Sequence, residues 1–270
     1  MASALGLEVD DAIPVHVSNR VAVRLRPSET LARVASPGHE AAQFEIDVAT
    51  RLARTSTVGG LDPRVAPRVY ERDGFTITLW TYYEAKSAAE LSPVAYADAL
   101  QRLHAGMRQI DISTPRFTDR VREAQELVAS AVRTRDLAEA DRRLLLDTFE
   151  NLTTAIAGRG AGEQLLHGEP HPGNILNTET GPLFIDLETC CRGPVEFDLA
   201  HVPEDVSERY PDVDQRLLGH CRVLVLAMVA AWRLDPGDRL PSGRQIAKDL
   251  LAALRSGPPY PPLGAFTGLQ

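Results

Sequence analysis

The segment from His167 to Leu176 reads HGEPHPGNIL and contains two histidines, a glutamate and an asparagine. A helical zinc motif of the metalloprotease type would place a glutamate directly after the first histidine and both histidines on one helical face. Here Glu169 comes one position later, and Pro170 and Pro172 prevent a regular helix through the segment. The segment therefore predicts a polar loop and not a zinc site.

This loop and the segment after it carry the oxygen atoms that phosphoryl transfer needs. Such chemistry uses a carboxylate that accepts a hydroxyl proton and, a few residues later, an amide oxygen that helps to hold Mg²⁺. Glu169 and Asn174, five residues apart, supply both groups. The next segment, ILNTETGPLFID, predicts a hairpin that turns at residues 178–181 and places Asp186 at the end of a strand. Amide and carboxylate oxygens, together with nucleotide phosphates, suit Mg²⁺.

Three ordered motifs, HGEPHPGNIL, FIDLE and GPVEFDLAH, closely resemble the catalytic core of the aminoglycoside phosphotransferase family. This family is the small-molecule branch of the protein-kinase-like fold, and its usual pattern is HGDxHxxN, then an IDxE-like strand and a GPxExDLA segment. The core match covers residues 165–201. Weaker likeness extends to ETLARV, FEIDVATRLA, LWTYYEA and ALQRLHAGM. Three motifs at compatible spacings are far more specific than any one of them.

The resemblance implies a role for each matched residue of the core. Glu169 stands where the family places its catalytic aspartate, and Asn174 and Asp186 would hold Mg²⁺. Asp198 would support the catalytic loop through hydrogen bonds, and His167 would have a structural role. Taken singly, each of these residues also fits a plain loop or turn position, and only their combination favours chemistry.

The resemblance also implies a nucleotide-binding part. Glu45 would pair with the basic residue of the third strand, Arg33, and Trp80 and Tyr82 would pass beside adenine. Alternatives stay open for each of them. Glu40 competes with Glu45 on the same helix, Arg33 sits on a half-exposed strand where arginines often face water, and the two aromatic residues equally suit a core.

The chain departs from the family pattern in three ways. Glu169 replaces aspartate, which lengthens the side chain by one methylene. Arg33 replaces the usual lysine, and the chain has only two lysines in total. No glycine occurs between Gly6 and Gly38, so a glycine-rich phosphate loop is missing, and the turn at Ser18-Asn19 is the only candidate in its place. We expect Asn19 to serve there because asparagine tolerates left-handed backbone conformations.

The pattern of apolar residues predicts the elements that position these side chains. Alternation predicts strands over residues 13–17, 20–26 and 30–35 and a hairpin over residues 67–80, with an amphipathic helix over residues 39–54 between them. Helices are expected over residues 93–107, where Ser92-Pro93 is the start signal, 117–134 and 137–157, where Asp136 and Glu139 have capping-box spacing, and again from Glu196 onward.

These elements predict an α+β protein with a two-lobed protein-kinase-like fold. Residues 1–84 would form the N-terminal nucleotide-binding lobe, a small antiparallel sheet with one helix. Residues 85–270 would form the larger, mainly helical C-terminal lobe with the catalytic loop and the acceptor site.

The composition excludes several classes of partner. A net charge of −8 and an isoelectric point near 5.4, with no run of basic residues, argue against a nucleic-acid partner. The longest apolar run, residues 223–232, is too short to span a bilayer, so no membrane partner is expected. Cys190, Cys191 and Cys221 have no framework spacing, which is typical of a reducing compartment, and we expect a cytoplasmic protein.

The leading hypothesis is an ATP- or GTP-dependent, Mg²⁺-requiring kinase that transfers the terminal phosphoryl group to a hydroxyl of a small molecule, either an aminoglycoside-like compound or another metabolite such as choline or homoserine. The rival is a degenerate kinase that binds nucleotide or metabolite without efficient turnover. An acidic group of residues is either a solvated helix face or a surface that attracts a cationic acceptor. Its members are Glu204, Asp205, Glu208, Asp212 and Asp214.

Overall fold

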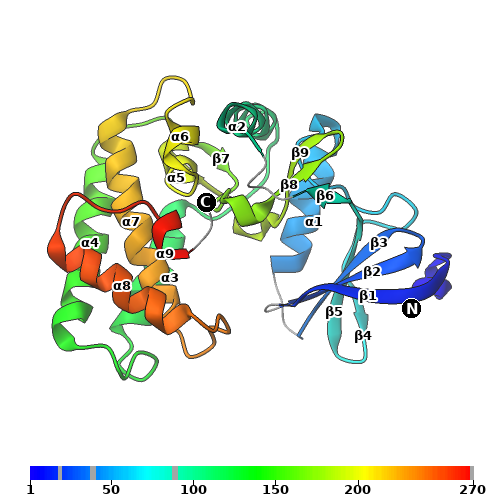
Figure 1. Cartoon of the computed structure of the whole chain (residues 1–270), viewed down its shortest axis with the longest axis horizontal. Helices are drawn as coiled ribbons and strands as arrows, with labels where there is room; N and C mark the ends of the chain where they lie inside the picture. Colours follow the sequence, from blue (N-terminus) through cyan, green and yellow to red (C-terminus); the bar gives the residue numbers. More distant parts are fainter. Residues whose placement is uncertain (18–19, 37–40, 87–90, 268–270) are drawn as a thin grey trace. The chain divides into compact units, whose positions relative to one another are not determined.

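The computed structural model describes residues 1–17, 20–36, 41–86 and 91–267. The chain divides into two compact units that exchange segments along the sequence (Figure 1). Unit 1 comprises residues 1–91, 102–112 and 174–189, and unit 2 comprises residues 92–101, 113–173 and 190–270. The division at residue 84 into a nucleotide-binding lobe and an acceptor-binding lobe stays a prediction.

Unit 1 is built on a five-stranded antiparallel sheet with the strand order β1-β2-β3-β5-β4. The predicted strands and the hairpin are all present in it. Its strands are β1 (Val9–Val17), β2 (Arg20–Pro27), β3 (Thr30–Ala35), β4 (Tyr70–Arg72) and β5 (Phe75–Thr81). The predicted helix is α1 (Ala41–Leu52), and its buried residues include Ile46, Val48 and Leu52.

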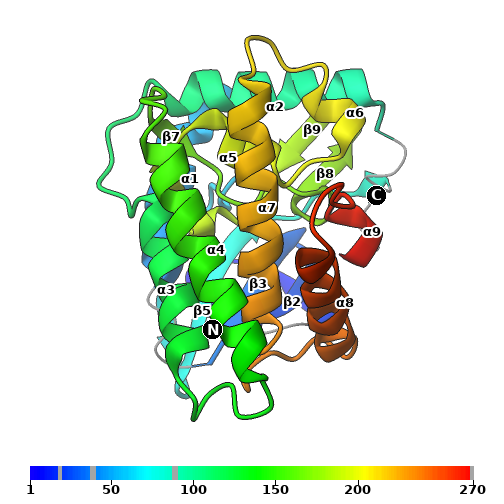
Figure 2. The ribbon, with the colours of Figure 1, turned by 90° about the vertical axis from the view of Figure 1, so that its left-hand side faces the viewer.

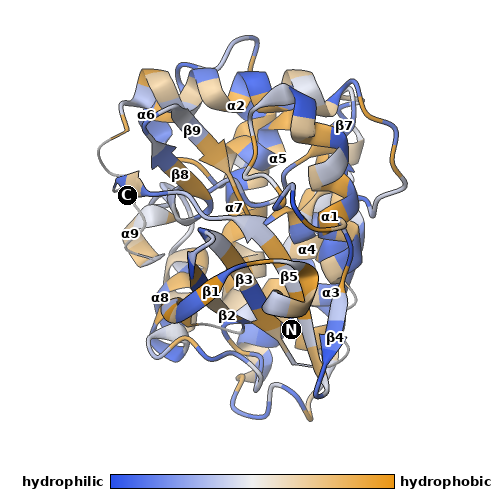
Figure 3. Ribbon diagram, turned by 90° about the vertical axis from the view of Figure 1, so that its right-hand side faces the viewer, coloured by the Kyte–Doolittle hydropathy of each residue, from blue (hydrophilic) through white to orange (hydrophobic). Residues whose placement is uncertain are grey.

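The β4–β5 hairpin forms where the sequence has a two-residue Asp73-Gly74 loop. Both residues have positive φ, 51° and 79°, which is the conformation that a tight primed turn requires and that aspartate and glycine tolerate. Of the two strands of this hairpin, β5 is the more hydrophobic. Figure 3 shows β4 in blue, whereas β5 beside it carries orange, hydrophobic segments. The core at this sheet consists of Leu7, Leu25, Ala32, Tyr70 and Leu79.

Unit 1 also contains a smaller three-stranded sheet, ordered β6-β8-β9. It consists of β6 (Ala85–Lys86), β8 (Ile175–Thr178) and β9 (Gly181–Phe184), and the β8–β9 pair is the predicted hairpin that turns at residues 178–181. The chain passes from unit 2 into unit 1 at the peptide bond between Gly173 and Asn174. Helix α2 (Pro93–Met107) contributes residues to both units.

Unit 2 is mainly helical. Helix α7 (Gln215–Trp232), whose middle turns are almost entirely buried, lies between α4 (Glu139–Ala157) and α8 (Gly243–Ser256), and α3 (Phe117–Ala129) packs on α4 and α7 (Figure 2). The remaining elements are β7 (Gln164–Leu166), β10 (Cys191–Gly193), α5 (Val195–Leu199), α6 (Glu204–Ser207) and α9 (Gly264–Thr267); short 3₁₀ helices in the chain are Ala2–Leu5, Ala53–Thr55, Pro172–Asn174 and Leu187–Thr189.

Two helix boundaries differ from the prediction. Helix α3 ends at Ala129, and the following residues turn back so that the Thr134 hydroxyl donates to the Ser130 carbonyl. The capping box of Asp136 and Glu139 does not form, because the N-cap of α4 is Ala138, without a side-chain cap. Burial of Leu137, which is 8% exposed, directly before this cap is consistent with the later start of the helix.

The three cysteines are free and buried. Within the ranges that the structure describes, no helix is both long enough and apolar enough to cross a lipid bilayer.

Candidate functional site

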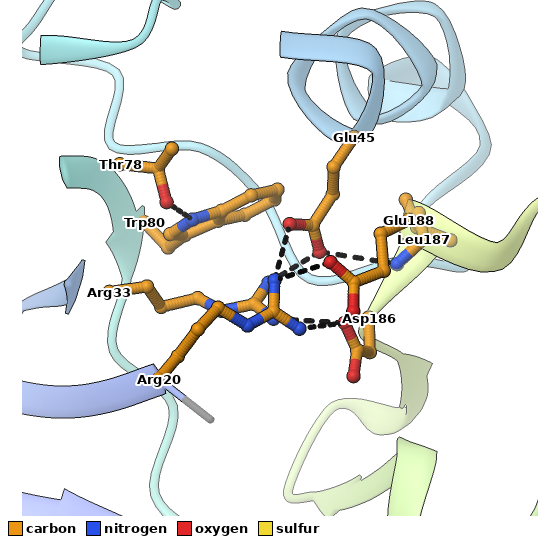
Figure 4. A network of polar contacts seen from close by, with 8 residues as sticks. All are labelled: Arg20, Arg33, Glu45, Thr78, Trp80, Asp186, Leu187 and Glu188. Atoms are coloured by element: carbon orange, nitrogen blue, oxygen red, sulfur yellow. Dashed lines mark hydrogen bonds and ion pairs between the residues drawn. The ribbon is translucent and has the colours of Figure 1, made fainter. Parts of the chain in front are cut away.

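Unit 1 contains a network of two arginines and three carboxylates, which we call the charged cluster (Figure 4). It brings together three residues that the sequence singled out, namely Arg33, Glu45 and Asp186. It adds two more, Arg20 and Glu188. The five side chains come from β2, β3, α1, the second residue after β9 and the 3₁₀ helix that follows it.

Strand register places the two arginines on the same face of the sheet. Ala22 pairs with Arg33, and side chains directly opposite each other on antiparallel strands share a face. Arg20 lies two residues before Ala22 and therefore faces the same way. The Arg33 guanidinium forms an ion pair with Oε1 of Glu45 through Nη1 and lies 2.9 Å from Oδ1 of Asp186 through Nη2.

Arg20 reaches the same carboxylates from the start of β2. Its Nη2 lies 2.5 Å from Oδ1 of Asp186, and its Nη1 lies 3.0 Å from Glu188 and 3.4 Å from Glu45. The side chain is only 14% exposed, so these ion pairs are shielded from water and weakly screened by salt. Arg20 is thus part of the candidate site and not a surface residue.

Trp80 supports this network from β5. Thr78 lies directly opposite Arg33, and Trp80 lies opposite Leu31. Side chains two residues apart on a strand share a face, so Arg33, Thr78 and Trp80 lie on the same face of the sheet. The Arg33 guanidinium carbon lies 5.6 Å from the centroid of the Trp80 ring, within the range of a cation–π contact. The indole N–H of Trp80 donates to the Thr78 hydroxyl at 2.8 Å, and the ring is buried. The face of the Trp80 ring is thus turned towards Arg33 of the charged cluster.

The β8–β9 hairpin positions Asp186 and Asn174 at the same end. Ile175 pairs with Phe184, and the Ile185 N–H donates to the Asn174 carbonyl at 3.0 Å. Asp186 then adopts a φ of 66°, a left-handed conformation that non-glycine residues rarely take, which redirects the chain directly after the strand.

The two oxygens of Asp186 have different surroundings. Both arginines contact Oδ1, whereas no described residue forms a hydrogen bond or ion pair with Oδ2. Burial alone would raise the pKa of Asp186, but the charges of Arg20 and Arg33 outweigh burial and hold that pKa below its usual value. Asp186 is therefore ionised at neutral pH, with one oxygen left for a further positive partner.

Glu45 is the most enclosed member of the charged cluster, with its side chain 2% exposed. Burial raises its pKa, Asp186 nearby adds to that increase, and the two arginines act against it. Its Oε1 also accepts a hydrogen bond of 3.2 Å from the Leu187 N–H, which links α1 to the segment after Asp186. Glu45 therefore fixes both Arg33 and that segment.

The donor set of the charged cluster fits a divalent cation. The ligating oxygens of Glu45, Asp186 and Glu188 lie within 4.8 Å of one another. Three carboxylates against two guanidiniums leave one excess negative charge, and Asn174 at the same end of the hairpin adds an amide group, with its side chain buried. Carboxylate and amide oxygens are the ligands that Mg²⁺ accepts.

In unit 2, Asp198 holds the predicted catalytic loop by its backbone. Its two carboxylate oxygens accept hydrogen bonds from the N–H groups of His167, at 2.9 Å, and Gly168, at 2.8 Å. Gly168 has a φ of 91°, which a side chain would disfavour, so the glycine permits this turn. His167 is fully buried, and its Nδ1 accepts the Glu169 N–H at 3.4 Å. The loop is therefore fixed directly before Glu169.

The Glu169 side chain, 23% exposed, forms an ion pair with Arg120 of α3. Burial would raise the pKa of Glu169, but Arg120, with smaller effects from His201 and His171, lowers it below the usual value. His201 is buried, and burial lowers its pKa to about 4, so it is neutral at neutral pH. Glu169 is thus ionised, as a proton acceptor must be.

Other residues named from the sequence have less informative surroundings. Asn19 lies outside the described residues. Tyr82 lies under Arg24, with the guanidinium carbon 4.1 Å from the ring centroid. His171 accepts a hydrogen bond from the Gly173 N–H at 3.1 Å through Nδ1. The adenine contact of Tyr82 therefore stays a prediction.

Sequence reasoning missed Arg20 and Arg120. A signal for Arg20 existed, because alternation along its strand places it on the face of the sheet that carries Arg33. Arg120 lies 49 residues before its partner Glu169, and no local pattern connects a helical arginine to a loop that far away.

Comparison with solved structures defines the class of fold. Amicoumacin kinase in complex with AMP-PNP and Ca²⁺ aligns at a TM-score of 0.72 and 10% identity, covering 97% of this chain and 93% of that one. Choline kinase LicA from Streptococcus pneumoniae aligns at 0.70 and 15%, covering 95% and 96%. Aminoglycoside 2'-phosphotransferase-IIIa in complex with GDP aligns at 0.69 and 12%, covering 94% and 96%. These similarities confirm the predicted two-lobed protein-kinase-like α+β fold.

The sequence itself gives the family. The model of the phosphotransferase enzyme family matches residues 12–220, more than half of the chain, and the chain belongs to this family. No protein of the curated collection matches significantly. Family and fold together confirm the predicted class, a phosphotransferase that acts on the hydroxyl group of a small molecule.

Proposed function

We propose that the protein transfers the terminal phosphoryl group of ATP to a hydroxyl of a small molecule in the presence of Mg²⁺. Glu169 of unit 2 accepts the proton of the attacking hydroxyl. Asn174 and Asp186 of unit 1 hold the metal ion, which when bound offsets the negative charge of the nucleotide phosphates. GTP is the alternative donor.

The observation that carries this proposal is the environment of Asp186. Two arginines hold its Oδ1 while Oδ2 has no partner among the described residues, and Asn174 lies at the same end of the hairpin. A carboxylate that is ionised and only half engaged is suited to a cation. The arginines beside it are suited to phosphate oxygens, which a planar guanidinium binds in a bidentate manner.

Arg33 and Arg20 therefore take the role that lysine usually has in this family. Without nucleotide, the three carboxylates of the charged cluster hold both guanidiniums. Nucleotide phosphates carry the same type of negative oxygen and compete for them, while Mg²⁺ compensates the carboxylates. Trp80 beneath Arg33 limits the directions in which this side chain moves. Its contact with adenine stays a prediction, as for Tyr82.

The acceptor is proposed only as a class. The solved structures with this fold include kinases named for amicoumacin, choline and ethanolamine and an aminoglycoside phosphotransferase. A cationic amino alcohol or amino sugar suits a chain with a net charge of −8, which attracts such acceptors at long range. The proposal includes a cytoplasmic location, which the free, buried cysteines support because thiols stay reduced in that compartment.

The test is an acceptor screen with Mg²⁺ and ATP or GTP that follows ADP or GDP release. Aminoglycosides, choline, ethanolamine and homoserine form the panel, and the phosphorylated product is identified by mass spectrometry. Turnover with one acceptor class that disappears in Asp186→Ala supports the proposal. Thermal stabilisation by the nucleotide without turnover for any acceptor favours the rival, a degenerate kinase that only binds.

A further inference from the structure

The catalytic loop carries a side chain that is longer than the family pattern specifies. Relative to aspartate, Glu169 has one more methylene and one more rotatable bond. The extra methylene shifts the carboxylate by about 1 Å, and a misplacement of that size can cost about a hundredfold in rate. A glutamate at this position therefore needs a partner that fixes the direction of its carboxylate.

Arg120, in the first turns of α3, has the contacts of such a partner. Its Nη2 forms an ion pair with Oε1 of Glu169, and its Nη1 lies 3.4 Å from the carbonyl oxygen of Gly168. Its guanidinium carbon lies 5.0 Å from the centroid of the Trp232 ring at the end of α7. Only 13% of the side chain is exposed. A planar group with a ring on one side and two acceptors has little freedom to reorient.

We propose that Arg120 is a positioning residue for Glu169, and that its guanidinium, supported by Trp232 and the Gly168 carbonyl, fixes the direction of the glutamate carboxylate. The catalytic consequence rests on the proposed function, because it requires Glu169 to accept the acceptor proton. The contact itself does not depend on any activity.

The charge of Arg120 has a second effect on Glu169. His201 is neutral at neutral pH, whereas arginine keeps its charge at every working pH. Arg120 is thus the constant positive charge that offsets the burial of this carboxylate. The titratable and charged groups around Glu169 are Arg120, His171, Cys191, Asp198 and His201.

The kinetic test compares Arg120→Gln and Arg120→Lys with Arg122→Gln, a control in the same helix whose side chain is 62% exposed. We expect Arg120→Gln to lower kcat by about 10- to 100-fold, with the KM for ATP little changed and the acidic limb of the kcat profile moved to higher pH. Lysine keeps the positive charge but lacks the planar guanidinium with its two donor nitrogens. Arg120→Lys should therefore lower kcat but leave the acidic limb of the kcat profile in place. The control should resemble the wild type.

A second measurement needs no turnover. The carboxyl carbon of Glu169, assigned by its absence in Glu169→Gln, is titrated by ¹³C NMR in the wild type, Arg120→Gln and Arg120→Lys. The pKa should lie below about 4.3 in the wild type and the lysine variant, and it should be higher in Arg120→Gln, where only the smaller effects of His201 and His171 still oppose burial.

The two experiments separate the two proposals. An unchanged Glu169 titration in Arg120→Gln, or an unchanged kcat in an active enzyme, overturns the role of Arg120. A shifted titration in a protein that phosphorylates no acceptor overturns the proposed function and leaves the Arg120 contact in place. If the glutamine variant does not fold, the lysine variant still decides, because unimpaired kcat there shows that the fork geometry is not needed.

Discussion

Asp186 in unit 1 and Glu169 in unit 2 are both carboxylates held by arginine, and each arginine contact is supported by an indole ring. In unit 1 the ring is Trp80, 5.6 Å from its guanidinium, and in unit 2 it is Trp232, at 5.0 Å. In both places arginine lowers the pKa of a carboxylate that burial would raise. The same local chemistry thus keeps two different acidic groups ionised.

The neighbours of the two carboxylates differ, and the difference indicates what each is for. Around Asp186 there are two further carboxylates and two arginines, so carboxylates outnumber guanidiniums by one, as the proposed cation site requires. Around Glu169 the close charged partner is Arg120, and the nearby His201 is neutral. The first arrangement suits exchange of partners when nucleotide and metal bind. The second suits a group that must stay in one direction.

The strongest way to test this comparison is Glu169→Gln. The amide keeps the size of the side chain but accepts no proton, so turnover should fall by about 10²- to 10⁴-fold. Nucleotide affinity should stay the same, because the residues assigned to phosphates and metal lie in unit 1. Steady-state kinetics and isothermal titration with an unreactive ATP analogue measure the two quantities. A variant that keeps wild-type turnover would remove Glu169 from the mechanism.

Replacing the arginines of the charged cluster should have the opposite signature. Arg33→Met and Arg20→Met each remove a charge-assisted contact to phosphate, worth about 1.5–3 kcal/mol, so nucleotide affinity should fall by about tenfold or more. Calorimetry with the same analogue measures this. Arg72→Met is the control, because Arg72 lies in the same sheet, on β4, but its side chain is 56% exposed and pairs with Asp73. If all three variants bind the nucleotide analogue as tightly as the wild type, the phosphates bind elsewhere.

Elements with a strong local pattern were predicted well. The alternation in β2 and β3 and the Asp73-Gly74 turn specify their structures through side-chain period and allowed φ values, which act within a few residues. The three motifs placed Asn174 and Asp186 on one hairpin, because strand pairing in a tight hairpin follows from the turn. The pairing of Arg33 with Glu45 came from the family resemblance, whereas the contact of Arg33 with Asp186 was seen only in the structure.

Features that depend on tertiary packing were missed or misplaced. The Arg120–Glu169 pair joins residues 49 positions apart in the sequence, and the Arg20–Asp186 pair joins residues 166 positions apart. No local sequence pattern predicts contacts between residues so far apart. The capping box at residues 136 and 139 has the right spacing, yet Ala138 is the N-cap of α4. Local propensity is a weak constraint that burial overrides.

The smallest expected effect concerns acid stability and has opposite signs at two glutamates. The folded-state pKa of Glu169 is lowered, so its ion pair contributes stability above the ordinary glutamate pKa that is lost as the pH falls. The folded-state pKa of Glu45 is raised, so its contribution is present at low pH and lost as the pH rises through that value.

The melting temperature of Glu169→Gln minus that of the wild type should therefore fall with increasing pH, whereas the same difference for Glu45→Gln should rise. Thermal melts between pH 3 and pH 7 should resolve these changes of about 2–4 °C. Slopes of the same sign would show that the two carboxylates are not in the contrasting environments described above, since burial dominates at one and arginine at the other.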